Sequence, residues 1–322
     1  MAWIAVHSVV TVVLALSSDQ DQSATEAATP LAQAACEPSN SLLDSNFFRS
    51  FAAMFPPSDQ CFPRFISPIS NVALAKDPRS LSRFYPVFIN NWLPSDHPVE
   101  GGTVQVYGAG LTMALNETCE IGIVKGGYAD KHFGNDDDGN GFFSTGAHFK
   151  KTLVRDIENQ FLLAVGVQLE PQSGQREVFH SHGDGLLTTF VTIGKEYCET
   201  DHFLATIGYQ LPADHNENST FIYTSLHYDR QLCGWVYPFI ECNWFAYTRG
   251  ADRGIPESFG EADGLANVGT SGIGGHSIVT IAVGTSFLRT DNTEFAIGYE
   301  TPVTPHDDVM DHRLHVKFTF KF

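Results

Sequence analysis

The most regularly spaced polar side chains lie at the end of the chain. In residues 313–322 every odd position is polar and every even position is apolar, which places the two kinds on opposite faces of a β-strand. Acids and bases on such polar faces can meet across an enclosed interior, either as a structural ion-pair network or as a selective path. Read in this way, several segments together contribute nine interior-lining candidates: Glu170, Glu241, Asn243, Glu294, Glu300, Arg313, His315, Lys317 and Lys321.

An acidic loop has part of the spacing of a calcium site. Within 135–141, Asp136, Asp138 and Asn140 fall at positions where calcium ligands are found. The bidentate glutamate of such a loop is due at position 147, which is occupied by Ala147. We therefore expect an acidic surface loop without a specific metal site, at which divalent cations can gather as counterions.

Two histidines close together suggest other chemistry. His180, His182 and Asp184 could hold a transition metal, although paired histidines are also common in free loops. A Ser/His hydrolase embedded in a membrane would need both groups on an apolar face near the rim, and no segment has this spacing. Neither a glycine-rich phosphate loop nor a nucleotide motif is present. We expect no catalytic residues, no cofactor and no enzymatic activity, with a membrane-embedded hydrolase as the weakest alternative.

The elements that position these side chains are segments in which apolar residues recur with a period of two. This period predicts β-strands with one apolar and one polar face. The second segment changes face near Gly108, which predicts a β-bulge. The twelve predicted strands cover 82–93, 102–117, 119–129, 142–154, 159–170, 186–198, 202–212, 220–230, 234–248, 276–289, 293–302 and 311–322.

The connections between these segments alternate strictly between short and long. In an up-and-down sheet this puts short turns at one end and long loops at the other. The predicted strands are longer than the five or so residues usual in a soluble sandwich and match the roughly 9–11 residues of a transmembrane strand. Even strand number, short turns, long loops and aromatic residues near strand ends are typical of an outer-membrane barrel. Aromatic residues near the predicted ends, expected to lie at the membrane interface, are Phe84, Tyr85, Trp92, Tyr197, Phe221, Tyr223, Trp235, Tyr237, Phe245, Tyr247 and Tyr299.

Composition agrees with this fold class and excludes several others. The 322 residues carry 37 acids and 19 basic side chains, for a net charge of −18, with 43% hydrophobic residues. An acidic chain without basic clusters is unsuited to nucleic acid, and this hydrophobic share excludes disorder. The six long connections contain 18 acids and four bases, so most of the net charge lies at one predicted end and forms an acidic rim there.

The N-terminal part differs from the rest of the chain. An apolar run of about 14 residues is too short to span a bilayer and predicts a signal peptide over 1–17. Residues 18–35 are expected to be a flexible linker, and 36–80 a periplasmic or lumen-plugging segment with one short amphipathic helix before Pro56. Residues 81–322 are expected to form the barrel. Lipidation at Cys36 is disfavoured because Gln33 stands where an aliphatic residue is needed.

The six cysteines are not arranged as a zinc ribbon, because no C-x-x-C pair is present. In an exported chain some of them can pair, and Cys36 with Cys61 is the favoured pair because both precede the regular strands. Six unpaired cysteines remain the alternative, which the sequence does not exclude.

At this point the chain resembles bacterial outer-membrane β-barrels. Phe318, Phe320 and the terminal Phe322 look like the C-terminal signature by which the barrel-assembly machinery recognises its substrates. The stretches 63–71 and 77–81 resemble the start of a family of exported barrels that is loosely similar to transporter-like proteins of phenol meta-pathway and other aromatic-compound degradation. The likeness continues over most of 60–322. It implies insertion among outer-membrane lipids in a Gram-negative-type envelope.

The resulting expectation is an all-β, antiparallel, up-and-down transmembrane barrel of about twelve strands. Its expected function is passive transport of small molecules, hydrophobic ones among them, across the outer membrane. A structural or adhesive surface protein with a closed lumen is the alternative from another class. Pore activity distinguishes the two.

Overall fold

The computed structural model describes residues 55–180, 182–290, 292–304 and 308–322. The predicted signal peptide, the predicted linker, the predicted amphipathic helix and Cys36 lie outside the described residues. Among the residues described, no helix is long and apolar enough to cross a membrane.

Twelve long strands make up the wall in the described part of the chain, each of 10 to 15 residues. They are β1 (Arg83–Leu93), β2 (Gly102–Asn116), β3 (Cys119–Phe133), β5 (Gly146–Asp156), β6 (Phe161–Glu170), β7 (Leu186–Tyr197), β8 (Asp201–Pro212), β9 (Thr220–Arg230), β10 (Val236–Arg249), β11 (Ser277–Thr290), β12 (Thr293–Pro302) and β13 (His312–Lys321). A thirteenth strand, β4 (Gly139–Phe142), is short and pairs with β3 alone.

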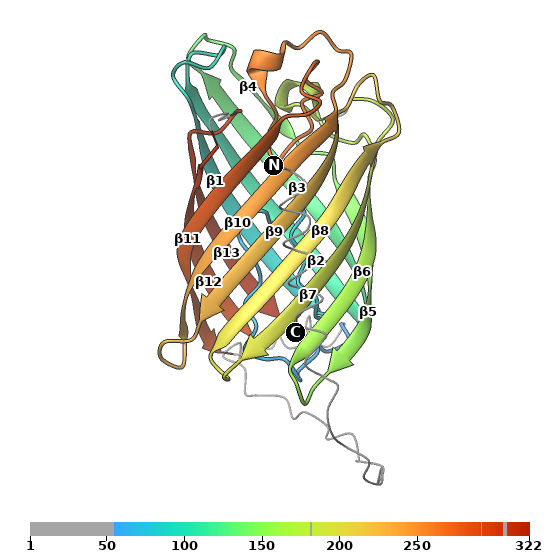
Figure 1. The fold of residues 1–322 in the computed structure, drawn as a ribbon, viewed down its shortest axis with the longest axis vertical. Helices are drawn as coiled ribbons and strands as arrows, with labels where there is room; N and C mark the ends of the chain where they lie inside the picture. Colours follow the sequence, from blue (N-terminus) through green and yellow to red (C-terminus); the bar gives the residue numbers. More distant parts are fainter. Residues whose placement is uncertain (1–54, 181, 291, 305–307) are drawn as a thin grey trace. The chain divides into compact units, whose positions relative to one another are not determined.

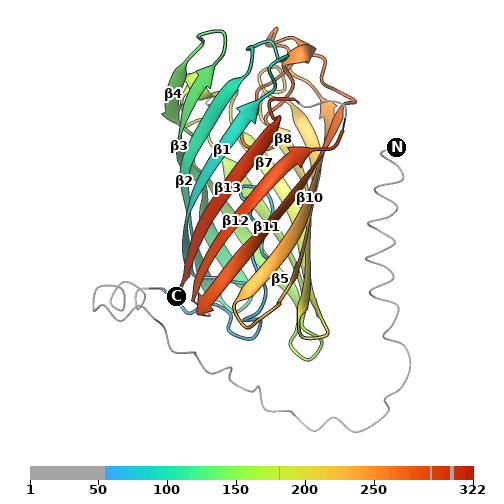
Figure 2. The same cartoon turned by 90° about the vertical axis from the view of Figure 1, so that its left-hand side faces the viewer.

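Every long strand is antiparallel to both of its neighbours, and the sheet closes on itself. Strand β1 pairs with β2 on one side and with β13 on the other, so the first and last strands meet. The remaining strands follow in chain order around the ring (Figures 1 and 2). Closure removes free sheet edges, which is what a barrel in lipid requires. The predicted all-β fold class and the number of wall strands are confirmed.

The ends of β3 and β5 differ from the prediction. Strand β3 continues to Phe133, opposite Gly102 of β2, and β4 turns back on it from Gly139, within the segment predicted to be a plain loop. Strand β5 begins only at Gly146. Weak alternation in this part of the sequence hid the hairpin, because glycines are frequent on both faces.

The predicted face change occurs at a bulge between β2 and β3. The pairs Ala109–Gly126 and Leu111–Ile123 flank it, so Gly110 stands opposite two residues of β3. The second of those two, Lys125, has a φ of 57°. This left-handed conformation is uncommon for a side chain other than glycine, and bulges of this kind often lie beside functional sites.

The two faces of the wall differ in polarity as the alternation predicts. On β13 the odd-numbered residues from Arg313 to Lys321 are all at most 5% exposed, whereas Phe318 on the even face is 45% exposed. The exposed outer face of the other strands is apolar as well, and includes Ile123, Phe149, Leu153, Leu169, Ile207, Ile240, Val283 and Ile297. A closed barrel with an apolar outer face is suited to a bilayer.

The aromatic residues near strand ends are only partly on that outer face. Trp235, Tyr197 and Tyr299 are exposed, but several predicted belt residues point inward and are buried: Tyr85, Phe221, Tyr223, Tyr237, Phe245 and Tyr247. For these the prediction of an interfacial aromatic belt is wrong. Phe245 and Tyr247, for example, share the inward face of β10 with the polar Glu241 and Asn243, and pack inside the barrel.

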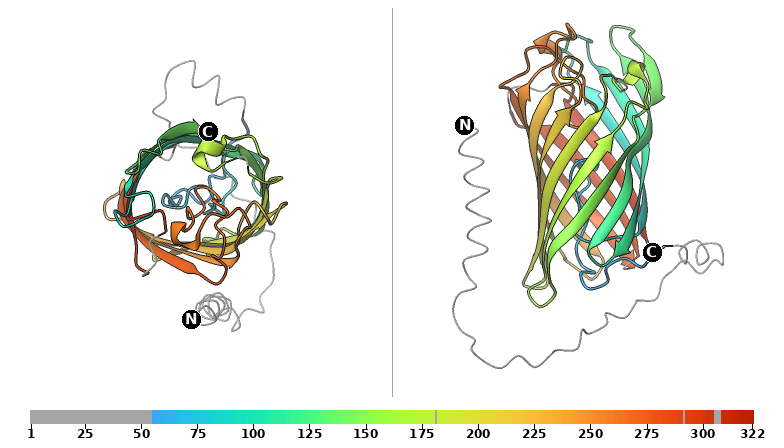
Figure 3. Two further views of the ribbon diagram at one scale, coloured as in Figure 1. Left: turned by 90° about the horizontal axis from the view of Figure 1, so that it is seen from above. Right: turned by 90° about the vertical axis from the view of Figure 1, so that its right-hand side faces the viewer.

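Two segments outside the wall fill the barrel. Residues 55–82, called the inserted segment below, run inside the ring, and residues 250–276, called the folded-in loop, cover it from the loop end. The view from above in Figure 3 shows both within the ring, in blue and orange respectively. Leu74 of the inserted segment packs against inward aromatic side chains, including Phe221 and Tyr223.

Candidate solute path and its closure

The inserted segment is attached to the wall through its backbone. Lys317 Nζ on β13 donates to the carbonyl oxygens of Ser67 and Pro68, at 2.7 and 2.9 Å. Across the barrel, Thr192 Oγ1 on β7 donates to the carbonyl of Lys76 at 2.6 Å. Hydrogen bonds from a charged donor contribute more than neutral ones, so the two bonds from Lys317 are the stronger part of this attachment.

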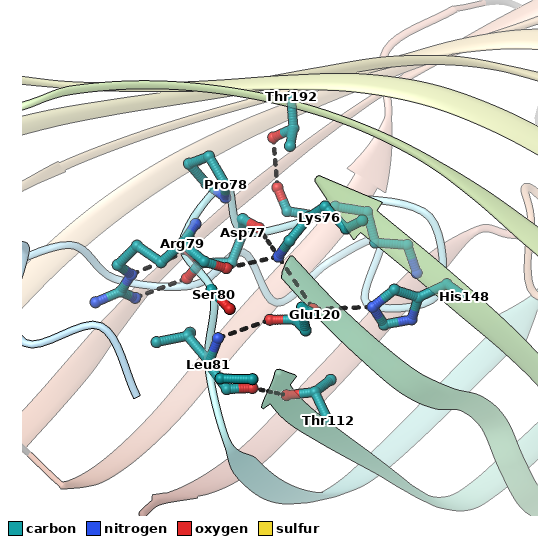
Figure 4. A network of polar contacts seen from close by, with 12 residues as sticks. Lys76, Asp77, Pro78, Arg79, Ser80, Leu81, Thr112, Glu120, His148 and Thr192 are labelled. Atoms are coloured by element: carbon teal, nitrogen blue, oxygen red, sulfur yellow. Dashed lines mark hydrogen bonds and ion pairs between the residues drawn. The ribbon is translucent and has the colours of Figure 1, made fainter. Parts of the chain in front are cut away.

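A second lysine holds the next part of the segment. Lys150 Nζ donates to the carbonyls of Asp77 and Arg79 at 2.5 and 2.6 Å. The same ammonium lies 3.0 Å from Glu120 Oε1, which is also 2.8 Å from His148 Nε2 (Figure 4). All five residues are buried, so the network is shielded from solvent.

Within the segment, Asp77 and Arg79 form a bidentate ion pair. Arg79 Nε lies 3.0 Å from Asp77 Oδ1 and Nη2 lies 2.6 Å from Oδ2. Burial alone favours the neutral acid, but the charge and hydrogen bonds of Arg79 hold the pKa of Asp77 well below its usual range. The pair keeps the irregular backbone of 77–79 in one shape inside the barrel.

Carboxylates and imidazoles alternate along the opposite side of the interior. Glu196 Oε2 lies 3.4 Å from His202 Nε2, and His202 Nδ1 lies 2.7 Å from Asp229 Oδ1. The other Asp229 oxygen is 3.0 Å from His227 Nε2, and His227 Nδ1 is 2.7 Å from Glu241 Oε1. Five buried groups from β7, β8, β9 and β10 thus form one connected chain.

Both ends of this chain hold the inserted segment. At one end, Arg64 Nη2 lies 2.9 Å from Glu196 Oε1. At the other end, Glu241 accepts the backbone N–H groups of Ile69 and Ser70 at 2.9 and 2.7 Å. With Arg64 included, this chain of contacts contains three carboxylates, one guanidinium and two imidazoles. Its charges cancel only when both imidazoles carry a proton.

The nine interior candidates from the sequence are all buried, with at most 5% exposure. Glu300 joins several of them: its oxygens lie 2.7 Å from His315 Nε2, 3.0 Å from Asn243 Nδ2 and 3.5 Å from Arg313 Nη1. Glu294 lies 3.5 Å from Lys317. The structure therefore places these residues inside the barrel, where most of them contact one another or the inserted segment.

His180 and His182, in the long loop between β6 and β7, contact different partners. His180 stacks on Phe143, with ring centroids 4.1 Å apart, and faces Glu170. His182 Nε2 instead lies 3.0 Å from Arg253 Nη2. Burial, together with the Arg253 charge, lowers the pKa of His182 to about 4. The two imidazoles of the candidate set His180, His182 and Asp184 therefore face different partners.

The acidic loop after β3 is built by hydrogen bonds among its own residues. Asp138 Oδ1 accepts the backbone N–H of Phe133 at 3.1 Å, and Lys131 lies 3.2 Å from Asp137. Across the described ranges, no group of three acidic, histidine or cysteine side chains is arranged to hold a metal ion. Asp138, one of the candidate calcium ligands, thus accepts a backbone N–H of the chain itself, and neither it nor Asp136 belongs to such a group.

The cysteines fall into two classes. Cys61 is disulfide-bonded, and its predicted partner Cys36 lies outside the described residues. Cys119, Cys198, Cys233 and Cys242 are free thiols. The alternative of six unpaired cysteines is therefore excluded.

A buried carboxylate organises the folded-in loop internally and ties it to Ser219 at the start of β9. Glu261 accepts the Ser219 hydroxyl at 2.6 Å and the backbone N–H groups of Val268, Gly269 and Thr270 at 2.8–3.1 Å. Burial raises the pKa of Glu261. The loop is a packed part of the interior, so it narrows the entrance.

Three of the cavities among the described residues lie between these fillings and the barrel wall, mainly against β1, β2 and β3. The loop-end cavity lies beneath the folded-in loop and is lined by apolar side chains, among them Leu93, Val104, Phe133 and Ala262, with Arg313 at its polar side. It shares Phe143 and Leu265 with the middle cavity. The two are therefore adjacent.

The middle cavity is apolar and lies against the bulge. Its lining includes Val87, Val106 and the small residues 108–110 and 126–127. It shares Val72 and Tyr85 with the turn-end cavity. The loop-end, middle and turn-end cavities thus follow one another from the long loops to the inserted segment.

The turn-end cavity differs in chemistry because charged side chains surround it. Lys76, Lys150, Lys317, Arg83, Asp77 and Glu120 are in its lining. The sequence indicated Lys317 as an interior residue, but not the other five. Lys76, Asp77 and Arg83 lie in or beside irregular chain, where no period marks a face, and Glu120 and Lys150 occupy strands whose alternation is weak.

Comparison with known proteins gives matches in structure alone. No known family matches the chain, and no curated relative is found. A solved outer-membrane channel from Pseudomonas putida F1 is 10% identical and superposes with a TM-score of 0.54 over 80% of this chain and 100% of that one. The NanC porin (7% identity, TM-score 0.47) and the KdgM porin (9%, 0.43) each match 74% of this chain, and 100% and 99% of their own. The chain has the closed antiparallel barrel fold of an outer-membrane channel.

Proposed function

We propose that this protein is an outer-membrane channel for the passive passage of small, mainly apolar molecules. The observation that carries the proposal is the series of three adjoining cavities beside β1–β3. The first two are lined almost entirely by apolar side chains, which suit apolar solutes better than ions or sugars. The fold shared with a solved channel supports the same class of function.

The inserted segment closes the path in the state described. It is fixed by Lys317, Lys150 and Glu241, so passage requires part of it to move. The same contacts favour the alternative, a structural or adhesive barrel whose lumen stays closed. The two functions therefore differ in whether the segment is released.

Liposome swelling distinguishes these functions. Purified full-length protein is reconstituted into liposomes, and swelling is followed in an uncharged solute, beside a variant with residues 56–79 deleted. The proposed channel predicts measurable solute entry for the full chain and faster entry for the deletion. A folded full chain and a folded deletion variant that both leave the liposomes impermeable would instead support the closed structural barrel.

Orientation, partners and cargo follow as parts of the same proposal. The short turns face the periplasm, the acidic loops face outward where divalent cations gather, and Phe318, Phe320 and Phe322 serve recognition by the barrel-assembly machinery. The resemblance to transporter-like proteins of aromatic-compound degradation favours aromatic cargo. Separation of inner and outer membranes, followed by detection of the protein, tests the location directly.

A further inference from the structure

One buried cation in the turn-end cavity lacks a counterion. The cavity is lined by four cationic side chains and two carboxylates. Glu120 is 3.0 Å from Lys150, and Lys317 is 3.5 Å from Glu294 behind it. The remaining charged residues of the cavity lining, outside these two ion pairs, are Asp77, Arg83 and Lys76.

Asp77 already has cationic partners and is therefore not available as a counterion for Lys76. Arg79 takes both of its oxygens, and Arg83 Nη1 lies 3.8 Å from Oδ2. Lys76 is 6% exposed, and its ammonium donates to the carbonyl of Ala73 at 2.7 Å. No carboxylate of the described residues lies within ion-pair distance of it.

The surroundings of Lys76 do not replace a counterion. Its ammonium lies 5.9 Å from the centre of the Phe190 ring, a contact of modest strength. Burial, with the neighbouring Lys150 charge, lowers the pKa of Lys76 to about 7. A buried ammonium is costly without a partner, so the site favours a ligand that supplies one negative charge.

The neighbouring space defines the rest of that ligand. The turn-end cavity adjoins the apolar middle cavity at Val72 and Tyr85. Arg83 lies over the Tyr85 ring, 5.0 Å from its centre, and Arg83 Nε has no hydrogen-bond partner. A molecule at this junction meets donors on one side and aliphatic and glycine surface on the other.

We propose that this junction binds small apolar monocarboxylates, with the carboxylate on Lys76 and Arg83 and the apolar body in the middle cavity. The inference rests on the proposed function and specifies its substrate class. A single carboxylate matches the single unpaired cation, and its apolar body fills the middle cavity. Inorganic phosphate, mainly a monoanion at pH 6, brings no apolar surface. The acidic rim affects the rate of anion entry more than the equilibrium in the buried site.

The test compares benzoate with benzamide, which has the same shape and no charge. Calorimetric titration of the full chain in nanodiscs at pH 6, where Lys76 is largely protonated, is expected to show at least about tenfold tighter binding of benzoate, equivalent to 1.4 kcal/mol. Inorganic phosphate is expected to bind more weakly than benzoate. Equal affinities for benzoate and benzamide, or tighter binding of phosphate, would overturn the assignment.

Variants locate the site. Lys76→Gln is expected to remove the preference for benzoate and Lys76→Arg to retain it. Lys195→Gln, the same charge change at a half-buried position near the end of β7, is expected to leave it intact. A benzoate preference that persists in a folded Lys76→Gln protein would overturn the proposed site. The benzoate–benzamide comparison needs no variant and so stands even if Lys76→Gln does not fold.

Liposome swelling separates this inference from the proposed function. Swelling in an uncharged solute without selective benzoate binding would overturn the binding site and leave the channel function standing. Selective binding without swelling would support the site and contradict passage through the barrel.

Discussion

Glu241 on the barrel wall accepts a hydrogen bond from the backbone N–H of Ile69 at 2.9 Å, across 172 positions of sequence. The contact ties a strand in the second half of the barrel to the segment that precedes the first strand. Because Glu241 also ends the chain of alternating carboxylates and imidazoles, the fixation of the inserted segment depends on the charge balance of the wall.

Replacement of Glu241 is expected to loosen the inserted segment. In Glu241→Gln the side chain keeps its shape but loses the charge that strengthens the bonds from Ile69 and Ser70, at a cost of about 1.5–3 kcal/mol. Open events in planar bilayers should become at least about tenfold more frequent. Glu158→Gln, at an exposed turn, is the matched control, and equal currents from both variants would contradict the assigned role of Glu241.

The neck between the loop-end and middle cavities is expected to control passage. Phe143 and Leu265 line both cavities, so Leu265→Trp should fill the junction. Liposome swelling in an uncharged solute should then fall toward that of protein-free liposomes. Leu232→Trp, at an exposed turn, should not change it. Unaltered swelling in a folded Leu265→Trp protein would show that solutes take another route.

Gly208 is expected to be required for stability, because a ring occupies the space above it. An added Cβ would lie 2.4 Å from atoms of the Tyr223 ring, whose hydroxyl donates to the carbonyl of Leu74 at 3.2 Å. Gly208→Ala should therefore destabilise the folded barrel by about 1–3 kcal/mol. Urea unfolding in detergent, followed by heat-modifiable gel migration, measures this. Gly108→Ala, where the nearest atom would be 3.4 Å away, should behave like the wild type.

Two exposed thiols report the orientation of the barrel. Cys198 and Cys233 lie in short turns and are exposed. If the turns face the periplasm, a bulky membrane-impermeant maleimide should label them only after the outer membrane is permeabilised. Asp137→Cys, in a long loop, should be labelled on intact cells. Labelling of Cys198 and Cys233 on intact cells would reverse the proposed orientation.

Acidification is expected to weaken the contact between two long loops. The pKa of His182 is lowered to about 4, by burial and by Arg253, so the folded chain binds its proton less readily than the unfolded chain. Stability from this residue is therefore present above pH 6.5 and is lost as the pH falls toward 4. The fall in Tm between pH 7 and pH 4.5 should be smaller in His182→Asn. An identical fall in both proteins would argue against this contribution.

Sequence periodicity was sufficient to predict the strands of the barrel wall. It was not sufficient to predict many of the residues that fill the barrel interior. Alternation on β13 identified Arg313 and Lys317 as interior residues because a strand offers only two faces. It did not identify Lys76 or Arg79, since irregular backbone has no period that links sequence position to direction. The inward aromatics Phe245 and Tyr247 were misassigned because aromatic side chains suit both a membrane interface and a packed core.

The sequence by itself determined that this chain forms a long-stranded antiparallel barrel, with short turns at one end and acidic loops at the other. Local rules sufficed for this, because alternation and loop length are properties of neighbouring residues. Only the tertiary structure decided that residues 55–82 occupy the interior, that Glu241 meets Ile69, and that Lys76 is buried without a carboxylate. These relationships join residues far apart in sequence and depend on barrel closure, which brings opposite walls and the inserted segment within hydrogen-bonding distance.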